Sequence, residues 1–171
     1  MRITITKGED EDRIEAVRAD GSSVSTRFPH KGPVPHDAVH FHVESALAIR
    51  DAFWGMVAAG KYPQEIADIA KVAGHASAKR AEVPDASIVP LLQAERLVEC
   101  FEADMWSGGE TGPEVLRDTI AAACAQSLVP PVEIADDTIC AIQSQLKALL
   151  RRWPATAAGE QLVLDCTWTA A

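Results

Sequence analysis

The spacing of apolar residues along the chain changes twice, and these changes constrain the fold more than any other feature. In the first thirty residues apolar side chains alternate with polar ones, which is typical of half-buried strands. From Pro35 to about residue 153 they recur every three to four residues, as on one face of an α-helix. Alternation returns in the segment 161–168. Strands at both ends of a helical middle predict an α+β fold, without the strand–helix repeats of a parallel sheet.

Three strands are predicted before the first helix, and they form an antiparallel meander. Asp20 and Gly21 lie between the second and third strands and favour a tight hairpin turn. The acidic run 8–12 is expected to be an exposed loop, because crowded like charges are costly in a core. The C-terminal strand is expected to return to this small antiparallel sheet, which about five helices cover on one face. The three N-terminal strand segments are 2–6, 13–19 and 22–28.

Proline and glycine residues divide the helical middle into five predicted helices. The first and longest runs from about residue 36 to 59 and is expected to pack on the sheet. Pro90 lies either in the first turn of its helix or at a kink. A length of 171 residues suffices for one sizeable core, so residues 1–171 are expected to form a single domain. The later helices are predicted to begin near residues 63, 85, 111 and 136.

Charge and cysteine content limit the expected partners and compartment. The 25 acidic and 16 basic residues give a formal net charge of -9, which repels phosphate backbones, so no nucleic-acid partner is expected. Neither a membrane span nor a signal peptide is expected from the apolar pattern. Cys100, Cys124, Cys140 and Cys166 form no C-x-x-C pair and are interpreted as reduced packing residues, which favours the cytoplasm. A protein partner or a homo-oligomer is left open.

The segment PHDAVHFHVESAL, residues 35–47, contains three of the five histidines. At 100° per residue, His36, His40 and Glu44 lie within an arc of about 80° on the predicted helix. His42 lies on another face. Two imidazoles one turn apart, with a carboxylate one turn further on, can share a divalent metal such as zinc. His36, His40 and Glu44 are therefore candidate metal ligands.

This spacing is partly similar to the H-E-x-x-H helix of zinc metalloproteases. In that motif the glutamate activates a water molecule, whereas here the shorter Asp37 follows the first histidine. Asp37 is the candidate catalytic residue of a metal-dependent hydrolase, or the group that orients a histidine or a water. Because the motif is partial, it leaves open whether the protein is an enzyme.

A structural role is the competing interpretation of the same stripe. His40 and Glu44 could pair with each other and position the helix, while His36 or Asp37 satisfies free N–H groups at its start. The protein would then be a structural or regulatory protein of the cytosol that interacts with a protein partner. This interpretation takes precedence on the sequence alone, because no complete ligand motif is present; the alternative is a divalent-metal-binding protein or a metal-dependent hydrolase.

Other residues are weaker candidates. His30 and His75 could each supply a further metal ligand, but both lie beside loop residues, where solvated histidines are common. Glu95, Glu99 and Glu102 form an acidic stripe that is interpreted as solvated surface, because no histidine or second acidic helix is expected to face it. A group of aromatic residues in the first helix is interpreted as core rather than as pocket lining. These aromatic residues are Phe41, Phe53 and Trp54.

Residues 35–60, PHDAVHFHVESALAIRDAFWGMVAAG, contain a further pattern. They resemble a recurrent block in an uncharacterised bacterial protein family, a P-H-D-x-x-H-F-x-V-E helix followed by F-W-G-x-V-A-x-G. Residues 151–168 are more faintly similar. His42 occupies a variable position of the pattern, and the family has no known activity, so the resemblance implies relatives without a reaction. The matching positions are Pro35, His36, Asp37, His40, Phe41, Val43, Glu44, Phe53, Trp54, Gly55, Val57, Ala58 and Gly60.

Overall fold

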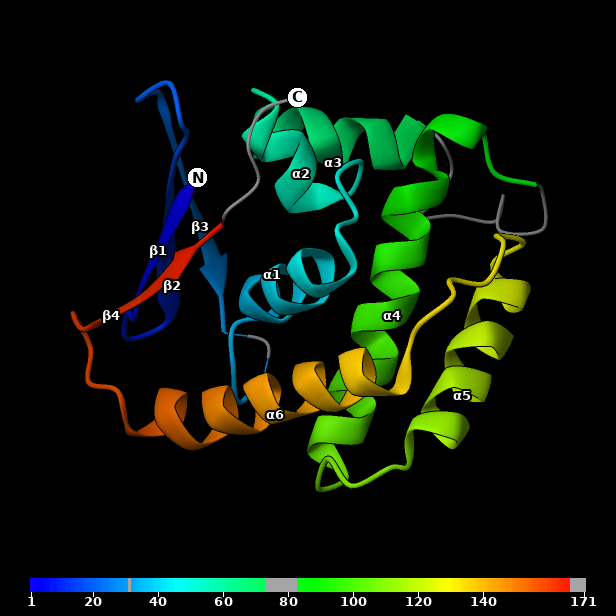
Figure 1. Cartoon of the computed structure of the whole chain (residues 1–171). Helices are drawn as coiled ribbons and strands as arrows, with labels where there is room; N and C mark the ends of the chain where they lie inside the picture. Colours follow the sequence, from blue (N-terminus) through cyan, green and yellow to red (C-terminus); the bar gives the residue numbers. More distant parts are fainter. Residues whose placement is uncertain (31, 73–82, 167–171) are drawn as a thin grey trace.

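The computed structural model describes residues 1–30, 32–72 and 83–166. Within these ranges the chain forms a four-stranded antiparallel sheet and six α-helices, which confirms the predicted α+β fold. The sheet lies on one side and the helices pack against one of its faces (Figure 1). His75 and the end of the predicted last strand, Thr167 and Trp168, lie outside the described residues.

The sheet has the strand order β3-β2-β1-β4, and all neighbours are antiparallel. The predicted return of the last strand is confirmed, since Ile3 of β1 lies opposite Leu164 of β4. Alternate residues along β1, β2 and β4 are buried, as their period of two predicts. The strands are β1 (Arg2–Thr6), β2 (Glu11–Val17), β3 (Ser23–Pro29) and β4 (Gln161–Asp165).

The acidic run does not lie wholly in an exposed loop, so this prediction was wrong for Asp12. Asp12 belongs to β2 and is buried. Its Oδ1 lies 2.7 Å from His30 Nε2 and accepts a hydrogen bond from the Gly8 N–H. These partners offset the cost of removing the carboxylate from water.

The predicted long helix 36–59 is two helices, so that prediction was wrong. α1 (His36–Leu47) ends where Ala48 adopts a left-handed conformation with a φ of 51°. α2 (Phe53–Ala58) begins after the turn 48–52. The buried Glu44 stabilises the break, because its Oε2 accepts a hydrogen bond from the Trp54 N–H in the first turn of α2.

The other helices begin near their predicted starts. Pro63 and Pro113 lie at the first position of α3 and α5, where a missing N–H is tolerated. Pro90 lies in the first turn of α4. The 3₁₀ turns η2 (Ala86–Ile88) and η3 (Trp153–Ala155) flank α4 and α6. The four helices are α3 (Pro63–Val72), α4 (Val89–Trp106), α5 (Pro113–Gln126) and α6 (Asp136–Arg152).

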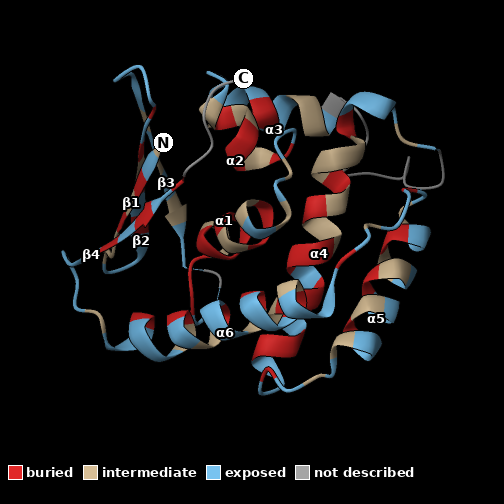
Figure 2. Ribbon diagram, viewed as in Figure 1, coloured by how far each residue is buried: buried red, intermediate tan, exposed pale blue. Residues whose placement is uncertain are grey.

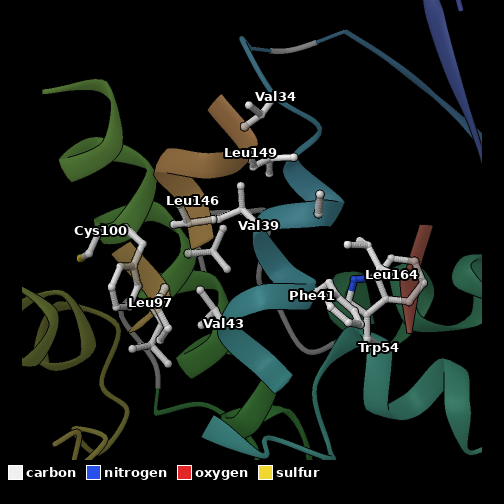
Figure 3. Close-up of a cluster of buried hydrophobic side chains, with 14 of the residues drawn as sticks. Val34, Val39, Phe41, Val43, Trp54, Leu97, Cys100, Leu146, Leu149 and Leu164 are labelled. Carbon is white, nitrogen blue, oxygen red and sulfur yellow. The ribbon is translucent and has the colours of Figure 1, made fainter. Parts of the chain in front are cut away.

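α1 lies between the sheet and the helices α4 and α6, and much of it is buried (Figures 1 and 2). Val39 and Val43 point toward Leu97 and Leu146, whereas Phe41 lies on the other side with Trp54 and Leu164 (Figure 3). Phe41 and Trp54 are therefore core residues, as predicted. Packing on two sides holds α1 in place, and this fixes the geometry of polar side chains on the rest of its surface.

The cysteines are free thiols, and three of the four are buried. Cys100 and Cys124 pack in the core from α4 and α5, as predicted. The packing role predicted for Cys140 was wrong, since this residue is exposed on α6. Among the described residues, no helix has both the length and the hydrophobicity needed to cross a membrane.

Candidate metal centre

His36 and His40 lie one turn apart on α1 and meet Glu95 of α4. Their Nε2 atoms are 3.2 Å apart. Glu95 Oε2 lies 3.2 Å from His40 Nε2, and Glu95 Oε1 lies 3.9 Å from His36 Nε2. One ligand atom from each residue lies within 4.8 Å of the other two. Since metal–ligand bonds of about 2.0–2.2 Å place tetrahedral ligands roughly 3.4 Å apart, the group has the size of a metal site.

Each histidine has a carboxylate at its other ring nitrogen. His36 Nδ1 lies 2.9 Å from Glu102 Oε1, and His40 Nδ1 lies 3.0 Å from Glu44 Oε1. A carboxylate that accepts the Nδ1–H favours the tautomer whose Nε2 lone pair can bind a metal. Both imidazoles therefore present the same atom to the same point.

Glu44, predicted as the third ligand, lies on the opposite side of His40 from Glu95. Its side chain is fully buried. Its Oε1 contacts His40 Nδ1, and its Oε2 accepts the Trp54 N–H at 2.8 Å. The structure therefore brings His36 and His40 together but uses both Glu44 oxygens elsewhere. In this arrangement Glu44 positions His40, and Glu95 has the position of a third ligand.

The sequence interpretation missed Glu95 and Glu102. Solvated surface was the wrong interpretation for both, since they face the histidines and their side chains are 28% and 12% exposed. Glu99, at 47%, does reach solvent. Glu95 and Glu102 are two turns apart on one face of α4, and this spacing could have indicated that they act together. Spacing alone does not say that this face lies against α1.

A cavity of about 470 Å³ adjoins the three residues. His36, Asp37, His40 and Glu95 form part of its wall, and most of the other described residues that line it belong to β3, α2, α3 and α4. Phe53 is half-buried and lines this cavity, so its assignment to the core alone was wrong. Three protein ligands beside a cavity would leave a coordination position open to a small molecule.

The chain matches none of the family models, curated proteins or solved structures with which it was compared. The chemistry of the group therefore follows from its own atoms. Two histidines that present the same nitrogen, together with a carboxylate on the third side, form a ligand set that suits zinc and other first-row metals.

The balance of charge around the two imidazoles favours a cation. Asp37, Glu44, Glu95 and Glu102 all lie close enough to interact with His36 or His40. Negative charge in a buried group is costly unless it is paired, and a divalent cation would supply positive charge between the two imidazoles and Glu95.

The pKa values of the buried groups reflect the same surroundings. Burial alone would lower the pKa of His40, but hydrogen bonds with Glu44 and Glu95 outweigh burial and raise the pKa to about 10. Burial raises the pKa of Glu44 and of Asp37, while the nearby histidines act in the opposite direction. In the metal-free protein His40 therefore holds a proton on the nitrogen that faces Glu95, and a metal must displace it.

The stability of the metal-free protein should fall as the pH rises. The pKa of a histidine is 6.5 in the unfolded chain, and that of His40 is about 10 in the folded protein, so the stabilisation is complete below pH 6.5 and is lost toward pH 10. Melting temperatures measured in chelator should decrease across this range more steeply for the native chain than for His40→Gln. Equal slopes for the two proteins would contradict the expectation.

The remaining histidines have other partners or lie outside the described residues. His42 Nδ1 lies 3.1 Å from Gln145 Oε1 of α6, which agrees with its exclusion from the predicted stripe. His30 contacts Asp12 in a second, smaller cavity. The role of His75 as a further ligand stays a prediction.

Proposed function

We propose that the protein binds one divalent transition metal, such as zinc, through the Nε2 atoms of His36 and His40 and the carboxylate of Glu95. The convergence of these two nitrogens, each held by a carboxylate on its Nδ1, carries the proposal. Two histidines and one carboxylate are the protein ligands of one class of catalytic zinc sites and of non-haem iron(II) sites. Glu44 and Glu102 are outer partners that orient the imidazoles.

The proposed activity of this centre is metal-dependent hydrolysis. A metal at the cavity wall would polarise a water molecule or a carbonyl oxygen in the open coordination position. Asp37 lines the same cavity and is half-buried beside the histidines. Asp37 therefore remains the candidate for accepting or donating a proton during the reaction.

A structural role remains the second candidate, and one observation favours it. Glu44 connects His40 to the first turn of α2, and this contact stabilises the fold whether or not a metal binds. A structural or regulatory protein with a protein partner needs no more than this contact. A structural role does not, however, require Glu95 and Glu102 to face the same two imidazoles.

The cytoplasm is the proposed compartment, with no nucleic-acid partner. Four free thiols support a reducing environment, in which buried cysteines act as packing residues. The formal net charge of -9 argues against a nucleic-acid partner, because it repels phosphate backbones.

Metal uptake by matched histidine variants tests the proposal. After treatment with chelator, the native chain should take up one zinc or cobalt(II) ion in equilibrium dialysis. His36→Ala removes one of three ligands and should weaken binding at least tenfold. His42→Ala changes a histidine of the same helix that faces Gln145, so this variant should bind as the native chain does.

The melting temperature distinguishes the two candidate functions. A metal at 100 times its dissociation constant stabilises the folded state by about 2.7 kcal/mol, or roughly 5–10 °C for a chain of this length. An unchanged melting temperature, together with equal metal uptake by the native chain and His36→Ala, would exclude the proposed ligand set. Those two results would leave the structural role.

A further inference from the structure

β3 is an edge strand, and one side of its backbone faces away from the sheet. Among the described strands it pairs with β2 alone. The Arg18 N–H donates to the Ser22 C=O at 2.8 Å, so these two residues form a hydrogen-bonded pair. Since bonded pairs alternate in an antiparallel ladder, the backbone groups of Ser23, Ser25 and Arg27 point away from β2. Within residues 1–30, 32–72 and 83–166 these groups have no hydrogen-bond partner.

The inward side of β3 is less covered than that of the other strands. The inward residues of β1, β2 and β4 are buried, whereas Val24, Thr26 and Phe28 are only half-buried (Figure 2). β4 is also an edge strand, yet its inward residues Leu162 and Leu164 are buried. An edge position alone therefore does not explain the exposure at β3. A strand added there would place alternate side chains beside these half-buried ones.

Arg27 determines which charge on an added strand suits this edge. Its side chain is exposed on the outer face of the sheet, directly opposite Arg13 of β2. Arg13 lies 3.5 Å from Glu15, whereas Arg27 forms no ion pair with a described residue. Like charges directly opposite each other are unfavourable, and a carboxylate on the other side of Arg27 would offset this repulsion. Salt screens the distant acidic residues of the chain, because the Debye length is about 8 Å at physiological ionic strength.

We propose that the edge of β3 binds an extended segment of a partner protein, which pairs antiparallel to β3 as an additional strand. The backbone of this segment forms hydrogen bonds with Ser23, Ser25 and Arg27. Its apolar residues face inward beside Val24 and Phe28, and an acidic residue lies opposite Arg27. The surface does not depend on the proposed metal centre, so either can fail without the other.

Fluorescence anisotropy of the labelled peptide Val-Glu-Val-Thr-Val-Thr-Val with the full chain, in about 0.15 M salt, tests the proposal. Directly opposite residues share a face, so the glutamate and threonines of the peptide are the residues whose N–H groups face β3. N-methylation of these three residues removes the donors and should weaken binding about tenfold or more. N-methylation of three valines keeps the donors and should leave binding unchanged. A lysine in place of the glutamate should weaken binding about threefold or more.

Ser25→Pro and Val163→Pro form a matched pair of variants at the two edges of the sheet. The Cys166 N–H donates to the Met1 C=O, so by the same alternation the Val163 N–H points away from β1. Proline is tolerated where an edge N–H faces away from the sheet, so both variants should keep the native fold. Ser25→Pro should weaken peptide binding about tenfold or more. Val163→Pro should bind as the native chain does, and Arg27→Glu should reverse the preference for the glutamate peptide over the lysine peptide.

Each contrary outcome overturns a defined part of the proposal. No peptide binding by the native chain, or an equal loss in the two proline variants, would overturn the β3 edge as the binding surface. If Ser25→Pro does not fold, the two N-methylated peptides decide this point. Equal binding of the glutamate and lysine peptides would overturn the acidic segment. If the native chain sediments as a dimer and Ser25→Pro as a monomer, then a second copy occupies the edge and the partner segment is overturned.

Discussion

Replacement of Glu44 by alanine should lower the free energy of unfolding by about 3–5 kcal/mol. Glu44 is 0% exposed and forms hydrogen bonds with two buried groups, the His40 imidazole and the Trp54 N–H. The substitution leaves His40 without one of the carboxylates that keep its proton, and it leaves a buried N–H without an acceptor. An unsatisfied buried donor alone costs about 1–3 kcal/mol.

Thermal melts with two further variants check this expectation. For a chain of this length the Glu44→Ala loss corresponds to a decrease of roughly 10 °C in melting temperature. Glu44→Gln keeps one acceptor oxygen but loses the charge, so its melting temperature should lie between those of the native chain and Glu44→Ala. Glu133→Ala removes an exposed glutamate and should change stability by less than about 0.5 kcal/mol. A Glu44→Ala decrease as small as that of Glu133→Ala would show that Glu44 does not hold α1 and α2 together.

The elements of the fold follow from local chemistry, and this is why the sequence predicts most of them. Alternation in β1 and β4 is a property of adjacent residues, and it identifies the face that packs on the helices. Pro63, Pro90 and Pro113 mark helix starts because a first-turn residue needs no N–H partner. Neither signal depends on knowing which elements meet in space.

The errors arise where a distant contact decides the local structure. Nothing near Ala48 resembles a glycine or proline helix end, yet α1 stops there. The Glu44 side chain favours the break, because it supplies an acceptor to Trp54 of the next helix. Asp12 is buried for a similar reason, since His30 approaches it from the end of β3. In each case the partner lies ten or more residues away, and composition gives no sign of the pairing.

The sequence likewise predicts only some residues of the candidate metal centre. The sharing of one helix face by His36 and His40 follows from the geometry of a single helix, and the sequence predicts it. The carboxylates of Glu95 and Glu102 approach from α4, and the sequence does not say that α4 faces α1. Glu44 lies on the predicted stripe, but the α2 start engages one of its oxygens and His40 engages the other. Helical periodicity therefore identifies two of the three proposed ligands, His36 and His40.

Removal of the Glu95 carboxylate should weaken cobalt(II) binding more than 100-fold. Loss of an outer partner such as Glu102 typically costs 10- to 100-fold in metal affinity, so Glu102→Gln should fall in that range. Glu95→Ala should exceed it, because it removes both a ligand and the negative charge nearest to the metal. Glu99→Ala changes the exposed glutamate one turn further along α4 and should leave the affinity unchanged.

The comparison of Glu95 with Glu44 separates a ligand from a positioning residue. Glu95 is partly exposed, so Glu95→Ala should reduce metal affinity strongly while the metal-free protein keeps most of its stability. Glu44→Ala should instead destabilise the metal-free protein, because its partners are buried. If Glu95→Ala binds cobalt(II) as tightly as Glu99→Ala, then the carboxylate of Glu95 is not a ligand.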